Sequence, residues 1–319
     1  GSLPDANNPG TLLDTFLVGT GVGVSEGIKP QFSDEYLAGF DYQLAPSLSF
    51  GVRGIYRTVG DVIEDISVDG GATYFVTNPG GTFTANPVTG ESLPEPVVFP
   101  RATRTYKAME LLVNKVAGSR WQLSASYVLS QNKGNYGGLF RQDNGQLDPN
   151  ITSLFDLPEL LKGADGLLPN DRTHQFKAYG SYRWPFKLVT GFFLQALSGT
   201  PLSKLGAHPT YGNRERFITD RGSEGRTPAF LNLDLHAEYP IRLAGKADLR
   251  FIADVFNVTN RQAAGLLDQE WTFEPLEETV DPNECGGADP NCPAGNPNYG
   301  KPLAYQGPFS LRLGVKLTW

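Results

Sequence analysis

The sequence predicts an all-β fold, an antiparallel transmembrane β-barrel of which this chain supplies about nine strands. Three observations carry this prediction. Apolar and polar residues alternate with a period of two in many segments, tight and long connections alternate between those segments, and aromatic residues gather at the segment ends. The composition agrees, because 37 glycines and 24 prolines in 319 residues disfavour long helices and supply turns.

The final segment, "PFSLRLGVKLTW", shows the alternation most clearly. One face of a strand would carry only apolar side chains there, which are Phe309, Leu311, Leu313, Val315, Leu317 and Trp319. The other face would carry Arg312 and Lys316 among small residues. A helix would mix these two classes on every side, so a strand is predicted.

Eight earlier segments repeat the pattern, although 105–116 and 186–198 alternate less cleanly. The nine predicted strands lie near residues 33–44, 48–59, 105–116, 121–131, 173–184, 186–198, 229–239, 247–258 and 308–319. Outer-membrane barrels have short periplasmic turns and long extracellular loops. We therefore expect one barrel domain over 1–319, with extracellular loops near 1–32, 60–104, 132–172, 199–228 and 259–307.

An odd number of strands is a problem for closure, because the first and last strands would run parallel. Bacterial single-chain barrels have even strand numbers, and an open edge in lipid leaves unpaired backbone groups. We therefore expect the chain to be one piece of a larger barrel with further strands N-terminal to it. A soluble β-sandwich is the alternative fold. Trp121, Trp184 and Tyr239 at segment ends favour the barrel, because they resemble its interfacial girdle.

The charge balance bears on partners. The formal net charge is −7 and no block of Lys and Arg occurs, which argues against nucleic acid as a partner. The segment "DPNECGGADPNC" is acidic and turn-rich, and Cys285 and Cys292 could close a small disulfide there in an oxidising compartment. A calcium ion held by Asp281, Glu284 and Asp289 is the alternative, but the spacing lacks the EF-hand pattern. No cofactor is expected otherwise.

Charged residues at the roots of the long loops could contact a ligand or pair with one another at the rim. These are Asp171, Arg172, Arg221 and Arg226. In "DVFNVTNRQ", Asn257, Asn260 and Arg261 are expected to cap a strand and organise the next loop, with contact to a ligand as the alternative. None of the three histidines accompanies a Gly-x-Ser-x-Gly elbow, and "KGNYGG" lacks the Lys-Ser or Lys-Thr pair of a phosphate loop. The sequence therefore predicts that the chain is not an enzyme.

Several stretches together resemble TonB-dependent outer-membrane receptors, in particular the Oar-like group with a carboxypeptidase-regulatory-like domain. The stretches fall within residues 106–319 and are "YKAMELLVNKVAGSRWQLSASYVLSQNKGNYGG", "LPNDRTHQFKAYGSYRWPFK", "SGTPLS", "DVFNVTNRQ" and "LRLGVKLTW". The resemblance implies the last nine strands of a 22-stranded barrel that an N-terminal plug closes. It also implies the outer membrane of a Gram-negative-type bacterium as the location.

The resemblance further implies a function and partners. Such receptors capture and import scarce nutrients with energy from TonB, ExbB and ExbD, and the barrel assembly machinery inserts them into the lipid. The terminal apolar set looks like the signal that this machinery reads, and it consists of Phe309, Leu311, Leu313, Val315, Leu317 and Trp319. The plug and the TonB box do not occur among these residues, so energy coupling cannot be argued from them. The alternative is a binding or structural barrel, either half of a split barrel or a surface adhesin, without active transport.

Overall fold

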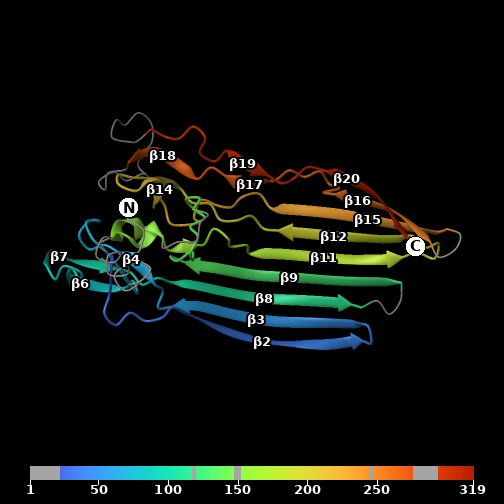
Figure 1. The fold of residues 1–319 in the computed structure, drawn as a ribbon, viewed down its shortest axis with the longest axis horizontal. Helices are drawn as coiled ribbons and strands as arrows, with labels where there is room; N and C mark the ends of the chain where they lie inside the picture. The colour runs from blue at the N-terminus through green and yellow to red at the C-terminus, as the bar shows by residue number, and fades with distance from the viewer. Residues whose placement is uncertain (1–21, 117–119, 147–151, 244–246, 276–293) are drawn as a thin grey trace, which may run out of the picture.

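The computed structural model describes residues 22–116, 120–146, 152–243, 247–275 and 294–319 (Figure 1). These residues form strands and irregular connections, with two short 3₁₀ turns, η1 (Ser153–Phe155) and η2 (Pro158–Leu161). In these ranges no helix has the length and apolar character needed to cross a membrane. The predicted all-β class is confirmed.

Nine long strands form an antiparallel meander in which each pairs with the next along the chain. They are β2 (Phe32–Ala45), β3 (Leu48–Gly60), β8 (Arg104–Lys115), β9 (Trp121–Gly134), β11 (His174–Arg183), β12 (Val189–Leu197), β15 (Phe230–Arg242), β16 (Asp248–Phe256) and β20 (Ser310–Thr318). All nine predicted strands are present, with ends that agree to within three residues. In the described residues, β2 and β20 are the free edges of this sheet.

The register places apolar side chains of neighbouring strands on one face, which we call the apolar face. Residues that are directly opposite one another in a sheet point to the same side. One such row crosses seven strands and consists of Phe40, Val52, Leu111, Tyr127, Phe176, Ala196 and Leu231. These side chains are not covered by a second layer, and Leu313 of β20 is 73% exposed.

The opposite face, here the polar face, carries charged side chains that pair across strands. His236, Asp254 and Arg312 lie directly opposite one another on β15, β16 and β20. His236 Nδ1 lies 2.6 Å from Asp254 Oδ1, and Arg312 Nη2 lies 2.8 Å from Asp254 Oδ2. Because Asp254 contacts both partners, the row forms a continuous polar ladder across the three strands.

The described parts of the four long connections lie at one end of the sheet, and the described short turns, between β2 and β3 and between β11 and β12, lie at the other (Figure 1). Together with residues 22–31 they form a body that we call the cap, made of the described parts of 61–103, 135–173, 198–229 and 257–309. The cap contains short strands where the sequence predicted loops. They are β1 (Val22–Val24), β4 (Glu64–Ile66), β5 (Tyr74–Thr77), β6 (Gly81–Ala85), β7 (Ser92–Phe99), β10 (Gly166–Leu167), β13 (Leu205–His208), β14 (Gly212–Phe217), β17 (Ala264–Leu267), β18 (Glu270–Pro275) and β19 (Pro302–Tyr305).

Pairing inside the cap joins separate connections. β1 pairs with β5 in parallel, β13 pairs with β18 in parallel, and β10 extends the sheet by pairing with the outer end of β9. Parallel pairs need partners that are distant in sequence, so no local pattern predicts them. The long connections are thus held to one another and do not hang as independent loops.

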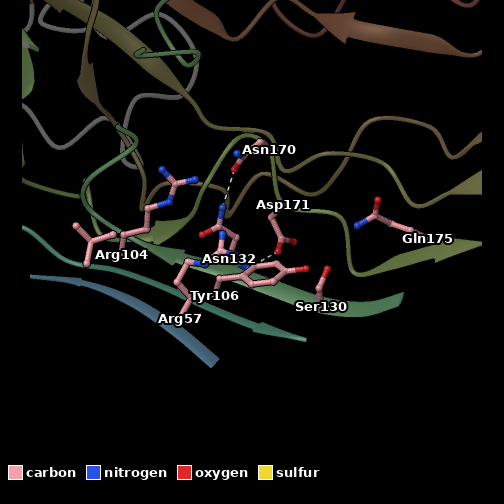
Figure 2. A pocket seen from close by; sticks show the side chains of 9 residues that line it. Arg57, Arg104, Tyr106, Ser130, Asn132, Asn170, Asp171 and Gln175 are labelled. Carbon is pink, nitrogen blue, oxygen red and sulfur yellow. Dashed lines mark hydrogen bonds between the residues drawn. The ribbon is translucent and has the colours of Figure 1, made fainter. Parts of the chain in front are cut away.

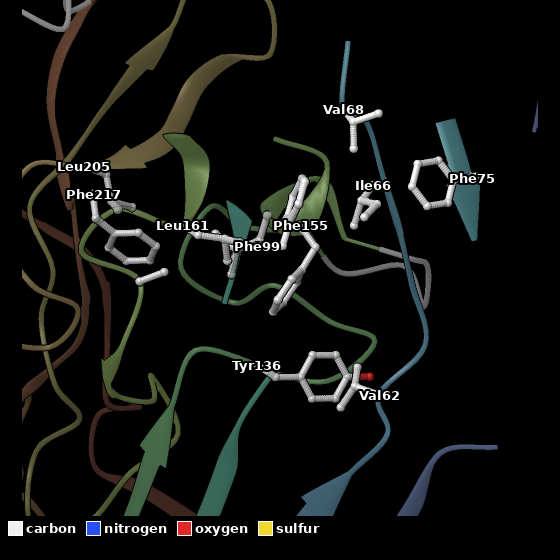
Figure 3. Packing of buried hydrophobic residues seen from close by; sticks show 12 residues of the cluster. Val62, Ile66, Val68, Phe75, Phe99, Tyr136, Phe155, Leu161, Leu205 and Phe217 are labelled. Carbon is white, nitrogen blue, oxygen red and sulfur yellow. The ribbon is translucent and has the colours of Figure 1, made fainter. Parts of the chain in front are cut away.

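The cap has its own hydrophobic core (Figure 3). Its buried members come from three of the long connections and are Val62, Ile66, Val68, Phe75, Phe99, Tyr136, Leu154, Phe155, Leu161, Ala164, Leu205 and Phe217. Phe155 on η1 is fully buried, and its ring lies 6.3 Å from that of Tyr136. Burial of the Val, Leu, Ile and Phe side chains of this core stabilises the cap by roughly 1.5–3 kcal/mol each.

Two buried ion pairs also join the connection 135–173 to the connection 198–229. Arg141 pairs with Glu215, and its Nη2 donates to the Glu215 carbonyl oxygen at 2.9 Å. Arg221 Nη2 lies 2.8 Å from Asp143 Oδ2, with both side chains at most 3% exposed. Buried pairs of this kind fix a geometry, because breaking one leaves an uncompensated charge in a poorly solvated place.

Candidate functional site

The candidate site is a cavity of about 350 Å³ where the polar face meets the cap (Figure 2). Its lining comes from β3, β8, β9, β11 and the end of the connection 135–173. The lining residues are Arg57, Val59, Arg104, Tyr106, Ser130, Asn132, Asn170, Asp171 and Gln175. This volume lies within the range of about 300–1,000 Å³ that is typical of small-molecule pockets.

Strand register brings three of these side chains into one row. Arg57 of β3 lies opposite Tyr106 of β8, and Tyr106 lies opposite Asn132 of β9. One step nearer the cap, Arg104 lies between Val59 and Gly134. Since alternate residues of a strand share a face, Arg104 and Tyr106 both point to the polar side.

Gly134 ends β9 with a φ of 150° beside this second row. A Cβ at this position would lie 2.1 Å from the Thr103 carbonyl oxygen. Only glycine therefore lets β9 approach the start of β8 so closely. After Gly134 the chain leaves the sheet and begins the connection whose end lines the cavity.

The end of the connection 135–173, at Asn170 and Asp171, forms the upper wall of the cavity and is fastened to β9. The backbone N–H of Asn132 donates to Asp171 Oδ1 at 2.6 Å, and Asn132 Nδ2 donates to Asn170 Oδ1 at 2.8 Å (Figure 2). Asp171 is 1% exposed and also pairs with Arg226, with Nη2 2.6 Å from Oδ2. Arg226 Nη1 in turn donates to the Gly199 carbonyl oxygen at 2.9 Å. The wall of the cavity is therefore braced by two long connections.

The charge of the cavity is unbalanced. Arg57 pairs with Glu35 of β2, and the Asp171 carboxylate is occupied by Arg226. Arg104 donates to the Gly137 carbonyl oxygen at 3.1 Å, and no carboxylate of the described residues lies within ion-pair distance of it. Asn132 Oδ1 is buried and accepts no hydrogen bond within the described structure. The site can offer a guanidinium and an unsatisfied amide oxygen to a polar ligand.

The charged loop-root residues predicted from the sequence occupy different positions. Asp171 lines the cavity and Arg226 holds it, as described above. Arg172 donates to the Ser198 carbonyl oxygen. Arg221 lies inside the cap, where its Nη1 donates to the Asn135 carbonyl oxygen at 3.0 Å beside Asp143. These residues make contacts within the rim, and the structure brings only Asp171 to the cavity wall.

Asn257 and Asn260 lie where the sequence placed them, at the outer end of β16. Asn257 has a φ of 46°, and its Nδ2 donates to the carbonyl oxygens of Arg261 at 2.9 Å and Gly307 at 2.8 Å. Asn260 Oδ1 accepts the backbone N–H of Phe309 at 3.0 Å. Asparagine tolerates this left-handed conformation better than other side chains, so both residues organise the connection before β20.

Other predicted residues lie outside the described part of the chain or apart from the cavity. Cys285, Cys292, Asp281, Glu284 and Asp289 fall in 276–293, so the disulfide and the calcium site stay predictions. Within the described residues, no group of three or more His, Cys, Asp or Glu side chains could hold a metal ion. The assembly-signal residues lie on or beside β20, on the apolar face.

None of the three histidines lines the cavity, although His174 directly precedes the lining residue Gln175. His174 Nδ1 lies 2.8 Å from the Tyr127 hydroxyl, and His236 pairs with Asp254 as described. His208 Nδ1 accepts the backbone N–H groups of Thr210 and Tyr211, both at 3.2 Å. Each histidine has local partners that account for its position.

Sequence reasoning missed a group of buried acids in the cap. Glu64 is fully buried, its Oε2 accepts the Thr152 N–H at 3.0 Å, and its Oε1 has no partner in the described structure. Burial raises the pKa of Glu64 to about 8. Burial, with the charge of Asp65 acting in the same direction, raises the pKa of Asp156 to about 7. No local pattern marks these acids, because their burial depends on packing between separate connections.

The chain is similar to known transport proteins. It is 34% identical over 332 residues to the TonB-dependent transporter Oar of Myxococcus xanthus, an alignment that covers 96% of this chain and 30% of that protein. The chain thus spans about a third of the length of this curated relative. The structure is similar to the outer-membrane ferripyoverdine receptor of Pseudomonas aeruginosa, with a TM-score of 0.50 and 12% identity over 90% of this chain and 27% of that receptor. This second likeness bears on the fold alone. No family model matches the chain.

Proposed function

We propose, from the premise that this chain is a relative of the Oar-type TonB-dependent transporters over nearly its whole length, that it forms wall strands and outer connections of an outer-membrane receptor for ligand uptake. The predicted resemblance is confirmed by that similarity. The observation that carries the functional proposal is the division of the molecule. In the described residues, a nine-stranded meander has an uncovered apolar face, a charged polar face and long connections gathered in a cap at one end.

The apolar face supports a setting in lipid. In water, contiguous exposed apolar area of this extent would be unfavourable, whereas in a bilayer it contacts acyl chains. The polar face then looks into the aqueous interior, and the cap lies on the extracellular side. Outer-membrane lipid and the further strands that complete the barrel are the partners of the sheet, since free edges at β2 and β20 cost several kcal/mol per unpaired group in hydrocarbon.

The cap and the cavity beneath it have the position expected for ligand capture. A ligand that enters from outside would meet the cap first and the cavity next, at the start of the interior. Release inward would follow movement of a plug that is coupled to TonB, ExbB and ExbD, and the barrel assembly machinery would read the apolar pattern ending at Trp319. These partners are inferred from the similar transporter, because no contact of the described residues identifies them. The prediction that the chain is not an enzyme accords with the description of that relative as a transporter.

Fractionation and growth measurements test this proposal. Cells that express the complete receptor should carry it in the outer-membrane fraction, with a gel mobility that shifts on heating. On a panel of scarce nutrients, deletion of the receptor should abolish growth on its ligand, and deletion of TonB should give the same defect without an additive effect. Recovery in the soluble fraction, or ligand uptake that persists without TonB, would overturn the proposal.

A further inference from the structure

We infer that the cavity beneath the cap is a binding subsite for a compact anionic group, a carboxylate or a phosphate, on a small polar ligand. The inference rests on the proposed function and specifies the chemistry of the ligand. It places the anion against Arg104, with Tyr106 and the amide of Asn132 contacting the polar part of the same ligand.

Charge is the first support. The cavity and the residues paired with it contain three guanidiniums, of Arg57, Arg104 and Arg226, and two carboxylates, of Glu35 and Asp171. Arg104 is the guanidinium that no described carboxylate neutralises. A guanidinium on a cavity wall is costly to leave without an anion, and it matches carboxylate and phosphate oxygens with two parallel N–H donors.

Unsatisfied hydrogen bonding is the second support. Asn132 is 7% exposed, and its Oδ1 has no donor in the described structure although its Nδ2 and backbone N–H are both bonded. A buried acceptor without a partner costs about 1–3 kcal/mol unless water or a ligand donates to it. A ligand that carries hydroxyl or amide donors beside its anionic group would satisfy it.

The position of the cavity is the third support. Its lower wall belongs to strands whose register is fixed by long ladders, so Arg104, Tyr106 and Asn132 are held rigidly. Its upper wall is Asn170 and Asp171, which belong to the cap. A ligand here would contact wall and cap together, and binding would therefore depend on the arrangement of the cap.

Calorimetry on the complete receptor in detergent at low salt tests the inference. The probes are glucuronate, glucose 6-phosphate and glucose, which share a sugar ring and differ in the anionic group. We expect at least one charged sugar to bind about tenfold or more tightly than glucose, and the stronger of the two identifies carboxylate or phosphate as the group. Equal binding of all three sugars, or no binding of any, would overturn the inference.

Substitutions inside and outside the cavity test whether the charged sugar binds there. Arg104→Gln should weaken binding of the charged sugar about 10- to 100-fold, the usual value of a charge-assisted hydrogen bond. The control is Arg53→Gln, which removes a cation from the same polar face outside the cavity and should leave affinity unchanged. Equal losses in both variants would show nonspecific attraction and would contradict a subsite.

Two further variants keep the test decisive if Arg104→Gln does not fold. Arg104→Lys retains the charge and should keep most of the affinity, while Tyr106→Phe removes only a hydroxyl and should weaken binding severalfold. Wild-type affinity in Tyr106→Phe would then overturn the inference. If uptake depends on TonB but charged sugars do not bind in the cavity, the inference is refuted and the proposed function is kept. If charged sugars bind in the cavity but uptake does not depend on TonB, the proposed function is refuted and the subsite is kept.

Discussion

In β20, Leu313 and Val315 are 73% and 65% exposed, whereas in the cap Phe155, Leu160 and Leu205 are fully buried. Paired arginines of the two regions also differ in their exposure to solvent. Arg312 on β20 is largely exposed although it is paired, and Arg221 in the cap is buried with Asp143. The nine-stranded sheet thus turns its apolar side chains outward, and the cap turns them inward.

One chain is therefore adapted to two solvents, with water around the cap and an apolar phase against the sheet. In the cap, apolar side chains leave water by packing on one another, with a gain of about 25 cal/mol per Å². On the sheet, the medium outside is the apolar phase, so the same side chains need no second layer. The boundary lies at the outer ends of the long strands, where the candidate cavity is found.

Loss of a large side chain should be costly in the cap. Phe155→Ala leaves a cavity in a packed core and should destabilise the cap by about 3–5 kcal/mol. Hydrogen exchange of cap amides in the complete receptor measures this loss. Phe40→Ala on the apolar face is the matched control, and acyl chains should fill its space at a much smaller cost. Equal protection of the cap amides from hydrogen exchange in both variants would contradict the contrast between the packed cap and the apolar face.

Stability of the cap should fall as pH rises from 5 to 8. The folded cap keeps a proton on Glu64, whose pKa is raised to about 8, while the unfolded chain loses that proton near its ordinary value of 4.5. Each pKa unit corresponds to about 1.4 kcal/mol, so the loss approaches roughly 4 kcal/mol and levels off above pH 8. Asp156 acts in the same direction.

Glu64→Gln provides the check for this pH dependence. The amide keeps the shape of the protonated acid and cannot ionise, so most of the slope in cap protection between pH 5 and 8 should disappear. The matched control is Asp65→Asn, which neutralises the adjacent carboxyl. Burial raises the pKa of Asp65 as well, but to a lesser extent, so this variant should remove a smaller part of the slope. An unchanged slope in Glu64→Gln would show that this carboxyl is not the group responsible.

A charge on the apolar face should be costly as well. Leu313→Arg near the middle of β20 should destabilise the folded receptor by about 2–4 kcal/mol, because the guanidinium would enter hydrocarbon. Urea titration in lipid vesicles, followed by the heat-dependent gel shift, measures the change. A loss within experimental error would mean that this face does not contact lipid.

The smallest effect is expected one residue away. Arg312→Ala removes the pair with Asp254 on the polar face, where the Arg312 side chain is 69% exposed. Solvent screens such a pair, so its removal should cost about 1 kcal/mol or less in the same titration. A loss as large as that of Leu313→Arg would reverse the assignment of the two faces.

The long strands could be predicted from the sequence because their signal is local. In β16 and β20, alternate residues meet different media, so the period of two is visible in any short window. The predicted start of β12 at residue 186 is three residues too early. Lys187 has a φ of 73° and the Trp184 carbonyl oxygen accepts the Lys187 N–H at 3.1 Å, so Phe186 and Lys187 belong to the turn.

The cap and most of the cavity could not be predicted in the same way. Arg141 and Glu215 are 74 positions apart, and neither lies in a pattern that marks the other as a partner. The period of two predicts Arg57 on the polar face, but its row with Tyr106 and Asn132 depends on the register between β3, β8 and β9. Asp171 and Arg172 both lie just before a predicted strand, and the structure brings only Asp171 to the cavity wall, so the pattern alone does not separate them.

Accessibility along β20 tests the two-solvent account most directly. Single cysteines would replace residues 310–317 one at a time in a complete receptor in which Cys285 and Cys292 are changed to serine. A water-soluble maleimide and a lipid-borne quencher then report the medium at each position in vesicles. The account predicts strict alternation, with 311, 313, 315 and 317 reached from lipid and 310, 312, 314 and 316 reached from water. Uniform labelling by the maleimide at all eight positions would contradict it.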